Sequence, residues 1–168
     1  MARDLQFNKK GKPVAEEKIL GFERRWELRL PLSVRRFLLE YNGGTPSKIN
    51  EFYPVPERFE EFWKEYDVVP NYTPGVGIPI FYSIGDEGGG LSVEGTMKIL
   101  TDSDQLAPHR VPLAGDGCGN EIMISVGPAD HERLYFWDHE LQREFPIADT
   151  FEEFLDGLTA LPKDPKVE

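Results

Sequence analysis

The stretch at residues 111–140, VPLAGDGCGNEIMISVGPADHERLYFWDHE, carries the clearest fold signal in the chain. Ile122, Ile124 and Val126 share one parity, the turn residues GPAD follow at 127–130, and a second apolar run begins at Leu134. Apolar residues at every second position are typical of a half-buried strand. The stretch therefore predicts a β-hairpin, and we expect the rest of the chain to cover it.

A glycine-rich segment, GDGCGN at residues 115–120, leads into the first of these strands. Glycine has no Cβ and reaches backbone angles that other residues avoid. Three glycines in five positions therefore predict a tight loop at the entry to the strand. After the second strand, WDHE at 137–140 predicts a polar turn.

Four other stretches have apolar residues three or four positions apart, which predicts amphipathic helices. The predicted helices cover residues 13–26, 31–41, 58–66 and 150–158. The second ends at Asn42-Gly43-Gly44, residues that tolerate the left-handed conformation found at helix ends. Thr150 with Glu153 predicts a capping box at the start of the fourth helix.

The remaining elements are predicted to be short strands and loops. Strands are expected at residues 49–55, 78–84 and 97–100, the last followed by an acidic turn at 101–104. The segment GDEGGG at 85–90 lacks the Gly-Lys-Ser/Thr ending of a phosphate-binding loop, and no clear helix start follows it, so a nucleotide site of that kind is not expected.

The chain is long enough for one domain, and we expect residues 1–168 to form a single one. Its first 12 residues are polar and are predicted to be a frayed leader before a structured core at 13–161. The predicted fold class is α+β: a largely antiparallel sheet of about five or six strands, with helices packed against it.

The net charge of −11 is unevenly distributed along the chain. Residues 1–66 contain 13 Lys and Arg against 11 Asp and Glu, whereas residues 67–168 contain 6 against 19. An acidic surface repels phosphate backbones and anionic lipid, so nucleic acid and membranes are poor partners. A basic protein would be attracted. The simpler interpretation is that the acidic surface only keeps the protein dissolved.

Catalytic and metal-binding patterns are weak. Cys118 lies on a glycine-rich turn, but no helix follows it to lower the pKa of a nucleophilic thiol. Three scattered histidines and the Asp102-x-Asp104 pair do not match metal-ligand spacings. We therefore expect no catalytic residue, no metal and no cofactor.

The location expected from the sequence is the cytoplasm. No apolar run approaches the roughly 18 residues of a membrane span, and the first residues lack the apolar core of a signal peptide. The chain has one cysteine, which excludes an internal disulfide.

Three motifs, in order, resemble the SUKH superfamily, which groups yeast cell-wall-assembly regulators with bacterial toxin-immunity proteins. The first is Leu30-Pro31 followed by a helix and YNGG at 41–44. The second lies in the central stretch: a strand, the loop GDGCGN, a second strand, a turn, and then LYFWDH at 134–139. The third is ADTFEEFL at 148–155. Together they span about residues 16–161.

The resemblance implies a non-enzymatic protein that binds and neutralises a cognate bacterial toxin. The charge distribution gives a physical reason to favour a basic, nuclease-type toxin, because an acidic protein can block the active or substrate-binding surface that holds phosphate. A regulatory or scaffold domain with endogenous partners is the main alternative, and a small hydrolase is a weaker one. The oligomeric state stays open.

The expected partner-binding residues are acidic side chains in turns or glycine-rich segments, and aromatic anchors, since a few aromatics commonly dominate binding. The acidic candidates are Asp86, Glu87, Asp102, Asp104 and Asp116. The aromatic candidates are Tyr72, Tyr82 and Trp137, of which Trp137 fits a core position equally well.

Overall fold

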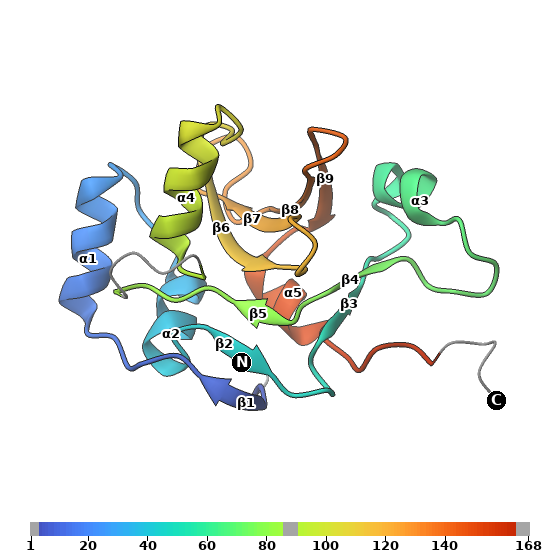
Figure 1. The fold of residues 1–168 in the computed structure, drawn as a ribbon, viewed down its shortest axis with the longest axis horizontal. Helices are drawn as coiled ribbons and strands as arrows, with labels where there is room; N and C mark the ends of the chain where they lie inside the picture. Colours follow the sequence, from blue (N-terminus) through green and yellow to red (C-terminus); the bar gives the residue numbers. More distant parts are fainter. Residues whose placement is uncertain (1–3, 86–90, 164–168) are drawn as a thin grey trace.

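The structure is a computed structural model that describes residues 4–85 and 91–163. In these residues, seven strands form an antiparallel sheet in the order β1-β2-β5-β6-β7-β8-β9, and two more form a small sheet, β3-β4 (Figure 1). The α+β prediction is confirmed, with a larger main sheet than the five or six strands expected.

The strands and helices have the following bounds. The strands are β1 (Phe7–Lys10), β2 (Gly44–Pro46), β3 (Phe52–Pro54), β4 (Gly75–Gly77), β5 (Ile80–Phe81), β6 (Arg110–Gly115), β7 (Glu121–Ser125), β8 (Leu134–Asp138) and β9 (Arg143–Ala148). The helices are α1 (Glu16–Arg25), α2 (Leu32–Glu40), α3 (Glu60–Tyr66), α4 (Val93–Asp102) and α5 (Phe151–Asp156).

The predicted hairpin is present as β7 and β8 in the main sheet. Ile122 pairs with Phe136 and Ile124 with Leu134, so the residues of one parity face the same side. On the other flank of β7, β6 carries the glycine-rich loop that enters the hairpin. The position of the hairpin within the sheet explains why all five residues of β7 are buried.

The central strands β6, β7 and β8 of the sheet are buried on both faces. Ile122 and Ile124 belong to the main core, which also contains buried side chains of α2 and α5. The intervening Met123 belongs to a second cluster with Tyr135, Trp137 and Leu100 of α4. Helix α4 contacts both clusters, because its Val93 and Met97 belong to the main core and its Leu100 to the second cluster.

The prediction of a strand at residues 97–100 is wrong, because these residues lie inside α4. Val93, Met97 and Leu100 are buried at helical spacing, and the Ser92 hydroxyl caps the helix by accepting a hydrogen bond from Gly95 N at 3.0 Å. A helix thus begins soon after the glycine-rich segment, where none was expected. The Gly-Lys-Ser/Thr ending is still absent from the sequence.

The prediction of a frayed leader at residues 1–12 is also wrong for the described part. Strand β1 pairs with β2 at the edge of the main sheet, and Leu5 is buried. Phe7 stacks on Tyr41 with ring centroids 4.7 Å apart. Only these inward side chains are apolar, while the rest of the edge strand is polar and exposed, so the segment has the composition of a tail.

Strand β9, at the opposite edge of the sheet, was not among the predicted strands. Phe145 and Ile147 are both fully buried, and the β9 main chain pairs with β8 from Leu134↔Ala148 to Asp138↔Arg143. Pro146 lies between them, as is common in edge strands. The carbonyl of Ile147 accepts a hydrogen bond from the Tyr53 hydroxyl at 3.1 Å, which covers part of the edge.

Candidate functional site

The predicted acidic residues do not form one patch. Asp102 ends α4 and Asp104 follows two residues later with a positive φ of 57°, and both are exposed. Asp116 follows β6, which runs back along α4 and therefore places it near the opposite end of that helix. A ten-residue helix is about 15 Å long, so Asp116 is well separated from the other two. Asp86 and Glu87 lie outside the described residues.

Asp116 organises the glycine-rich loop. Its carboxylate accepts hydrogen bonds from Cys118 N at 2.7 Å, Asn120 N at 3.1 Å and Asn120 Nδ2 at 2.8 Å. Gly117 and Gly119 have φ values of 82° and 94°, which only glycine adopts without strain. The carboxylate is thus committed to the loop, as the glycine pattern predicts for a shape-critical turn.

Two of the three predicted aromatic anchors are in the interior. Tyr82 is 6% exposed and Trp137 is 7% exposed, so neither presents a free face to a partner. Trp137 packs in the cluster beneath α4, as its alternative core assignment anticipated. Tyr72 is half-buried, in the connection between α3 and β4.

Glu121 is a buried acid that the sequence analysis did not single out. It begins β7, is 9% exposed, and accepts a hydrogen bond from the Tyr82 hydroxyl at 2.6 Å. Burial raises the pKa of its carboxyl group to about 7, with a further increase from the charge of Asp116. One acid at the start of an apolar strand is the only signal that the sequence offers for it.

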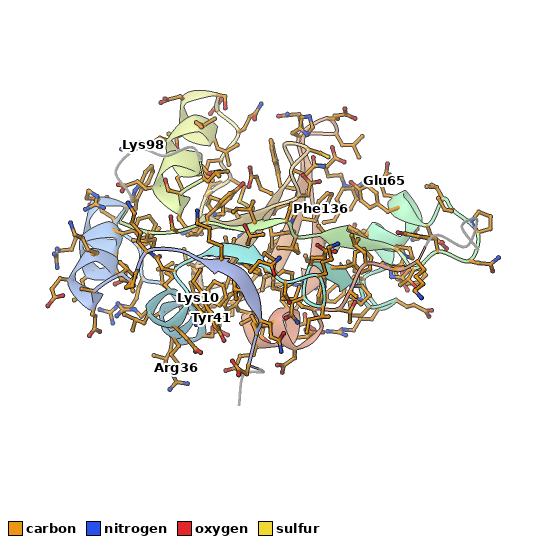
Figure 2. All side chains as sticks on the ribbon, turned by 60° about the horizontal axis from the view of Figure 1, so that its bottom comes forward. Lys10, Arg36, Tyr41, Glu65, Lys98 and Phe136 are labelled. Carbon is orange, nitrogen blue, oxygen red and sulfur yellow. The ribbon has the colours of Figure 1, made fainter. Side chains whose placement is uncertain are left out.

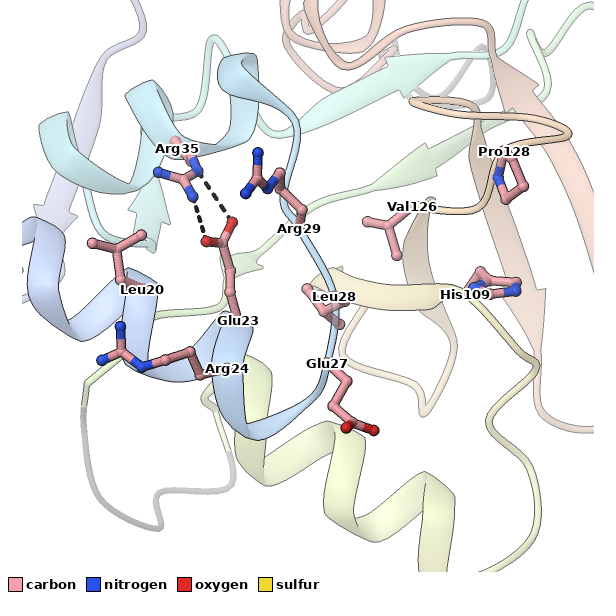
Figure 3. Close-up of a pocket in the computed structure, with 10 residues that line it drawn as sticks. All are labelled: Leu20, Glu23, Arg24, Glu27, Leu28, Arg29, Arg35, His109, Val126 and Pro128. Carbon is pink, nitrogen blue, oxygen red and sulfur yellow. Dashed lines mark hydrogen bonds and ion pairs between the residues drawn. The ribbon is translucent and has the colours of Figure 1, made fainter.

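A groove opens beside the connection between α1 and α2 (Figure 3). Its larger recess has a volume of about 510 Å³, and an adjoining recess of about 390 Å³ shares four lining residues with it. The shared residues are Glu27, Leu28, His109 and Val126. Of the predicted acidic residues, Asp104 lines the second recess.

The larger recess combines an apolar floor with charged walls. The carboxylate of Glu23 is buried and accepts hydrogen bonds from Leu30 N at 2.7 Å and Arg35 Nε at 3.1 Å (Figure 3). Arg24 and Arg29 also line the recess, and no ion pair joins either of them to a carboxylate within residues 4–85 and 91–163. The recess can therefore accept polar or charged side chains of a partner.

The histidines of the chain do not assemble an acid–base site. His139 is held in the turn after β8, where its main-chain N and its Nδ1 lie 3.0 and 2.8 Å from Asn120 Oδ1. His109 lines the groove, and His131 is exposed. Across the part of the chain that the structure describes, no three His, Cys, Asp or Glu side chains are placed to hold a metal ion.

Comparison with known protein families places the chain in one of them. The model of the SMI1 / KNR4 family (SUKH-1) matches residues 13–157, which cover most of the chain. The chain belongs to this SUKH-1 family. No curated protein matches it. The matched region runs from just before α1 through α5, so the SUKH-1 assignment includes the main sheet from β2 to β9 and both recesses of the groove.

The described helices are also too short or too polar to cross a bilayer: none of them combines the length and the apolar character of a membrane span. The longest, α1 and α4, have ten residues each. A span needs about 20 residues. Their apolar faces pack instead against the core.

Proposed function

We propose that this SUKH-1 protein is a non-enzymatic immunity protein that binds and neutralises a cognate bacterial toxin. Membership of the SUKH-1 family, shown by the match over residues 13–157, supports the proposal, because the SUKH superfamily includes bacterial toxin-immunity proteins. The toxin is a basic, nuclease-type protein, and the acidic chain blocks its active or substrate-binding surface. Inhibition is steric and electrostatic, without covalent chemistry.

The charge of the chain supports a basic partner. A net charge of −11 accelerates encounter with a positively charged protein and disfavours nucleic acid itself as a ligand. Asp102 and Asp104 are exposed and have no ion-pair partner within the described residues, so they are available for this attraction. The negative charge of Asp116 adds to this long-range attraction, but its carboxylate oxygens already accept hydrogen bonds within the loop.

The internal contacts of the polar side chains favour binding over catalysis. The buried carboxylate in the groove lining, Glu23, is occupied by Arg35 and by a main-chain N–H. The other buried carboxylate of interest, Glu121, is bonded to Tyr82 beneath the surface. A general base needs hydrogen-bond access to its substrate, and these contacts restrict that access.

The probe for neutralisation is a candidate toxin, defined as a basic nuclease module encoded in the gene neighbourhood of this chain. The purified chain is mixed with that module at equal concentration, and complex formation is followed by size-exclusion chromatography while nuclease activity is assayed. We expect one stable complex and loss of nuclease activity. Full toxin activity in an excess of the chain would contradict the proposal, and stable binding only to endogenous regulatory proteins would favour the scaffold alternative.

A further inference from the structure

The connection between α3 and β4, residues 67–74, projects from the body of the protein beyond the small sheet (Figure 1). It carries two consecutive apolar side chains, Val68 at 75% and Val69 at 45% exposed. Among the described residues, Val68 is the most exposed large hydrophobic side chain. Single exposed apolar residues are ordinary, whereas two adjacent ones in a projecting segment are a candidate contact surface.

The base of this segment is firmly packed. Phe62 and Tyr66 of α3 contact Phe136 at ring-centroid distances of 5.7 and 5.5 Å, both edge to face. The Tyr66 hydroxyl donates a hydrogen bond to Asp138 at 2.6 Å, and the Trp63 indole donates one to a main-chain carbonyl at 2.8 Å. Helix α3 is therefore fixed to β8 before the segment begins.

The segment itself folds back through a turn. Tyr72 N donates a hydrogen bond to the Val69 carbonyl at 3.1 Å, and Asn71 adopts a left-handed φ of 63°. Beyond the turn, the carbonyl of Pro74 accepts a hydrogen bond from Val55 N at 3.1 Å. The two valines are thus presented between two anchored ends, which reduces the conformational entropy lost when a partner covers them.

Acidic side chains surround the base of the segment. Exposed acids lie at Glu57, Glu60, Glu61, Glu65 and Asp67, whereas the exposed basic residues of the same stretch are Arg58 and Lys64, so acidic side chains outnumber basic ones by three over residues 57–74. Glu61 lies 3.6 Å from the Arg143 guanidinium, whereas the other four have no ion-pair partner in the part of the chain that the structure describes. Figure 2 shows Glu65 pointing away from the body. This local acidity is hidden when charges are counted over residues 1–66, where they nearly balance.

We propose that residues 57–74, the α3 arm, form the surface with which this chain docks on a basic protein partner. Val68 and Val69 enter an apolar hollow of that partner, and the unpaired carboxylates of the arm contact its basic rim. The proposal rests on the proposed function, for which it names the interface. A basic partner fits this surface best, because the acidic side chains immediately precede Val68 and Val69 in the chain.

Ile99 is an exposed apolar side chain outside the arm that lacks this combination. Ile99 on α4 is 60% exposed, but its sequence neighbour Lys98 and the nearby Asp102 give it flanks of opposite charge. Ile99 lies within a helix whose opposite face is already packed on the sheet. It therefore serves as a matched control of similar exposure.

The test compares Val68→Thr/Val69→Thr with Ile99→Thr in the full chain. Threonine keeps the shape of valine and replaces a methyl group with a hydroxyl. The probe is the same toxin module encoded beside the gene, and the dissociation constant is measured by calorimetry. We expect the double variant to bind at least about tenfold more weakly, and Ile99→Thr to bind within about twofold of the original chain. Unchanged thermal unfolding of both variants shows that the fold is retained.

The outcomes separate the two proposals. Wild-type affinity in the folded Val68→Thr/Val69→Thr variant, with neutralisation intact, would overturn the α3 arm alone. An original chain that neither binds nor neutralises the module would overturn the proposed function and the arm with it. Self-association of the original chain that the double variant abolishes would assign the arm to a second copy and overturn the toxin-docking assignment.

Discussion

At the scale of single residues, Glu121 is the most unusual group of the protein. Its carboxyl group is buried beside Tyr82, and the next three residues of its strand are apolar. Gly115 allows this approach, because a Cβ at that position would lie 2.3 Å from the Tyr82 hydroxyl oxygen. The small residue and the hydrogen bond together let a carboxyl group occupy an interior position.

Glu121 should make the free energy of unfolding depend on pH. Burial raises its folded pKa from 4.5 to about 7, so the folded state binds the proton more tightly than the unfolded state does. This contribution is fully present below about pH 4.5 and is lost as the pH rises through about 7. We expect the stability of the original chain relative to Glu121→Gln to fall by about 1–3 kcal/mol between pH 4.5 and pH 8.

Urea unfolding of both proteins at the two pH values measures this change. Glu121→Gln keeps the size of the side chain and removes its titration, so other ionisable groups affect both proteins alike. A constant stability difference across the range would show that the Glu121 carboxyl titrates in the folded protein as it does in the unfolded chain.

At the scale of elements, the helix starts differ in their capping. Thr150 Oγ1 accepts a hydrogen bond from Glu153 N at 3.1 Å at the start of α5, as the capping-box pattern predicts, and Glu153 reaches back to Asp149 N at 2.7 Å. Helix α1 begins after Ala15, which has extended backbone angles and no side-chain capping bond. The capping-box prediction is therefore confirmed at α5, whereas the Ser92 cap of α4 lies at a helix start that was not predicted.

Changes at these two caps should act in opposite directions. Thr150→Ala removes the side-chain acceptor and should lower the free energy of unfolding by about 1 kcal/mol, whereas Thr150→Ser should be close to neutral. Ala15→Ser supplies an acceptor to α1 and should raise it by about 0.5–1 kcal/mol. Chemical denaturation measures all three, and a stability of Thr150→Ala equal to that of Thr150→Ser would contradict the role of the Thr150 hydroxyl in holding α5.

At the scale of the whole molecule, the net charge governs how fast partners meet it. Asp102 and Asp104 are exposed at the end of α4, apart from the α3 arm along the chain. Charges outside an interface change the rate of association through the long-range field and are screened by salt. These two residues should therefore affect the association rate more than the dissociation rate.

The double charge reversal Asp102→Lys/Asp104→Lys tests this expectation. In stopped-flow mixing with the toxin module, we expect association to slow several-fold at about 50 mM salt and to approach the original rate at about 500 mM. The neutral pair Asp102→Asn/Asp104→Asn should give an intermediate rate. Equal association rates for all three proteins at low salt would show that Asp102 and Asp104 do not contribute to the electrostatic attraction between the chain and the toxin module.

Sequence patterns located the hairpin, α2 and the α5 capping box because each depends on local spacing. The hairpin follows from period-two alternation at Ile122 and Ile124, and the end of α2 follows from Asn42 and Gly43, whose φ values are 45° and 77°. Both signals depend only on residues that are close together in the sequence. The family resemblance used the same segments, which is why it agrees with the match over residues 13–157.

Tertiary structure decided what lies on the second face of the sheet and which residues reach a partner. Residues 97–100 are apolar enough for a short strand, and packing on the sheet, together with the Ser92 cap, favours the helix that covers Trp137. Likewise, β1 is polar except where Leu5 and Phe7 meet the core. Exposure depends on contacts between segments distant in sequence, so the sequence determined the fold class, whereas the structure revealed the burial of Tyr82 and Trp137 and the exposure of Val68 and Val69.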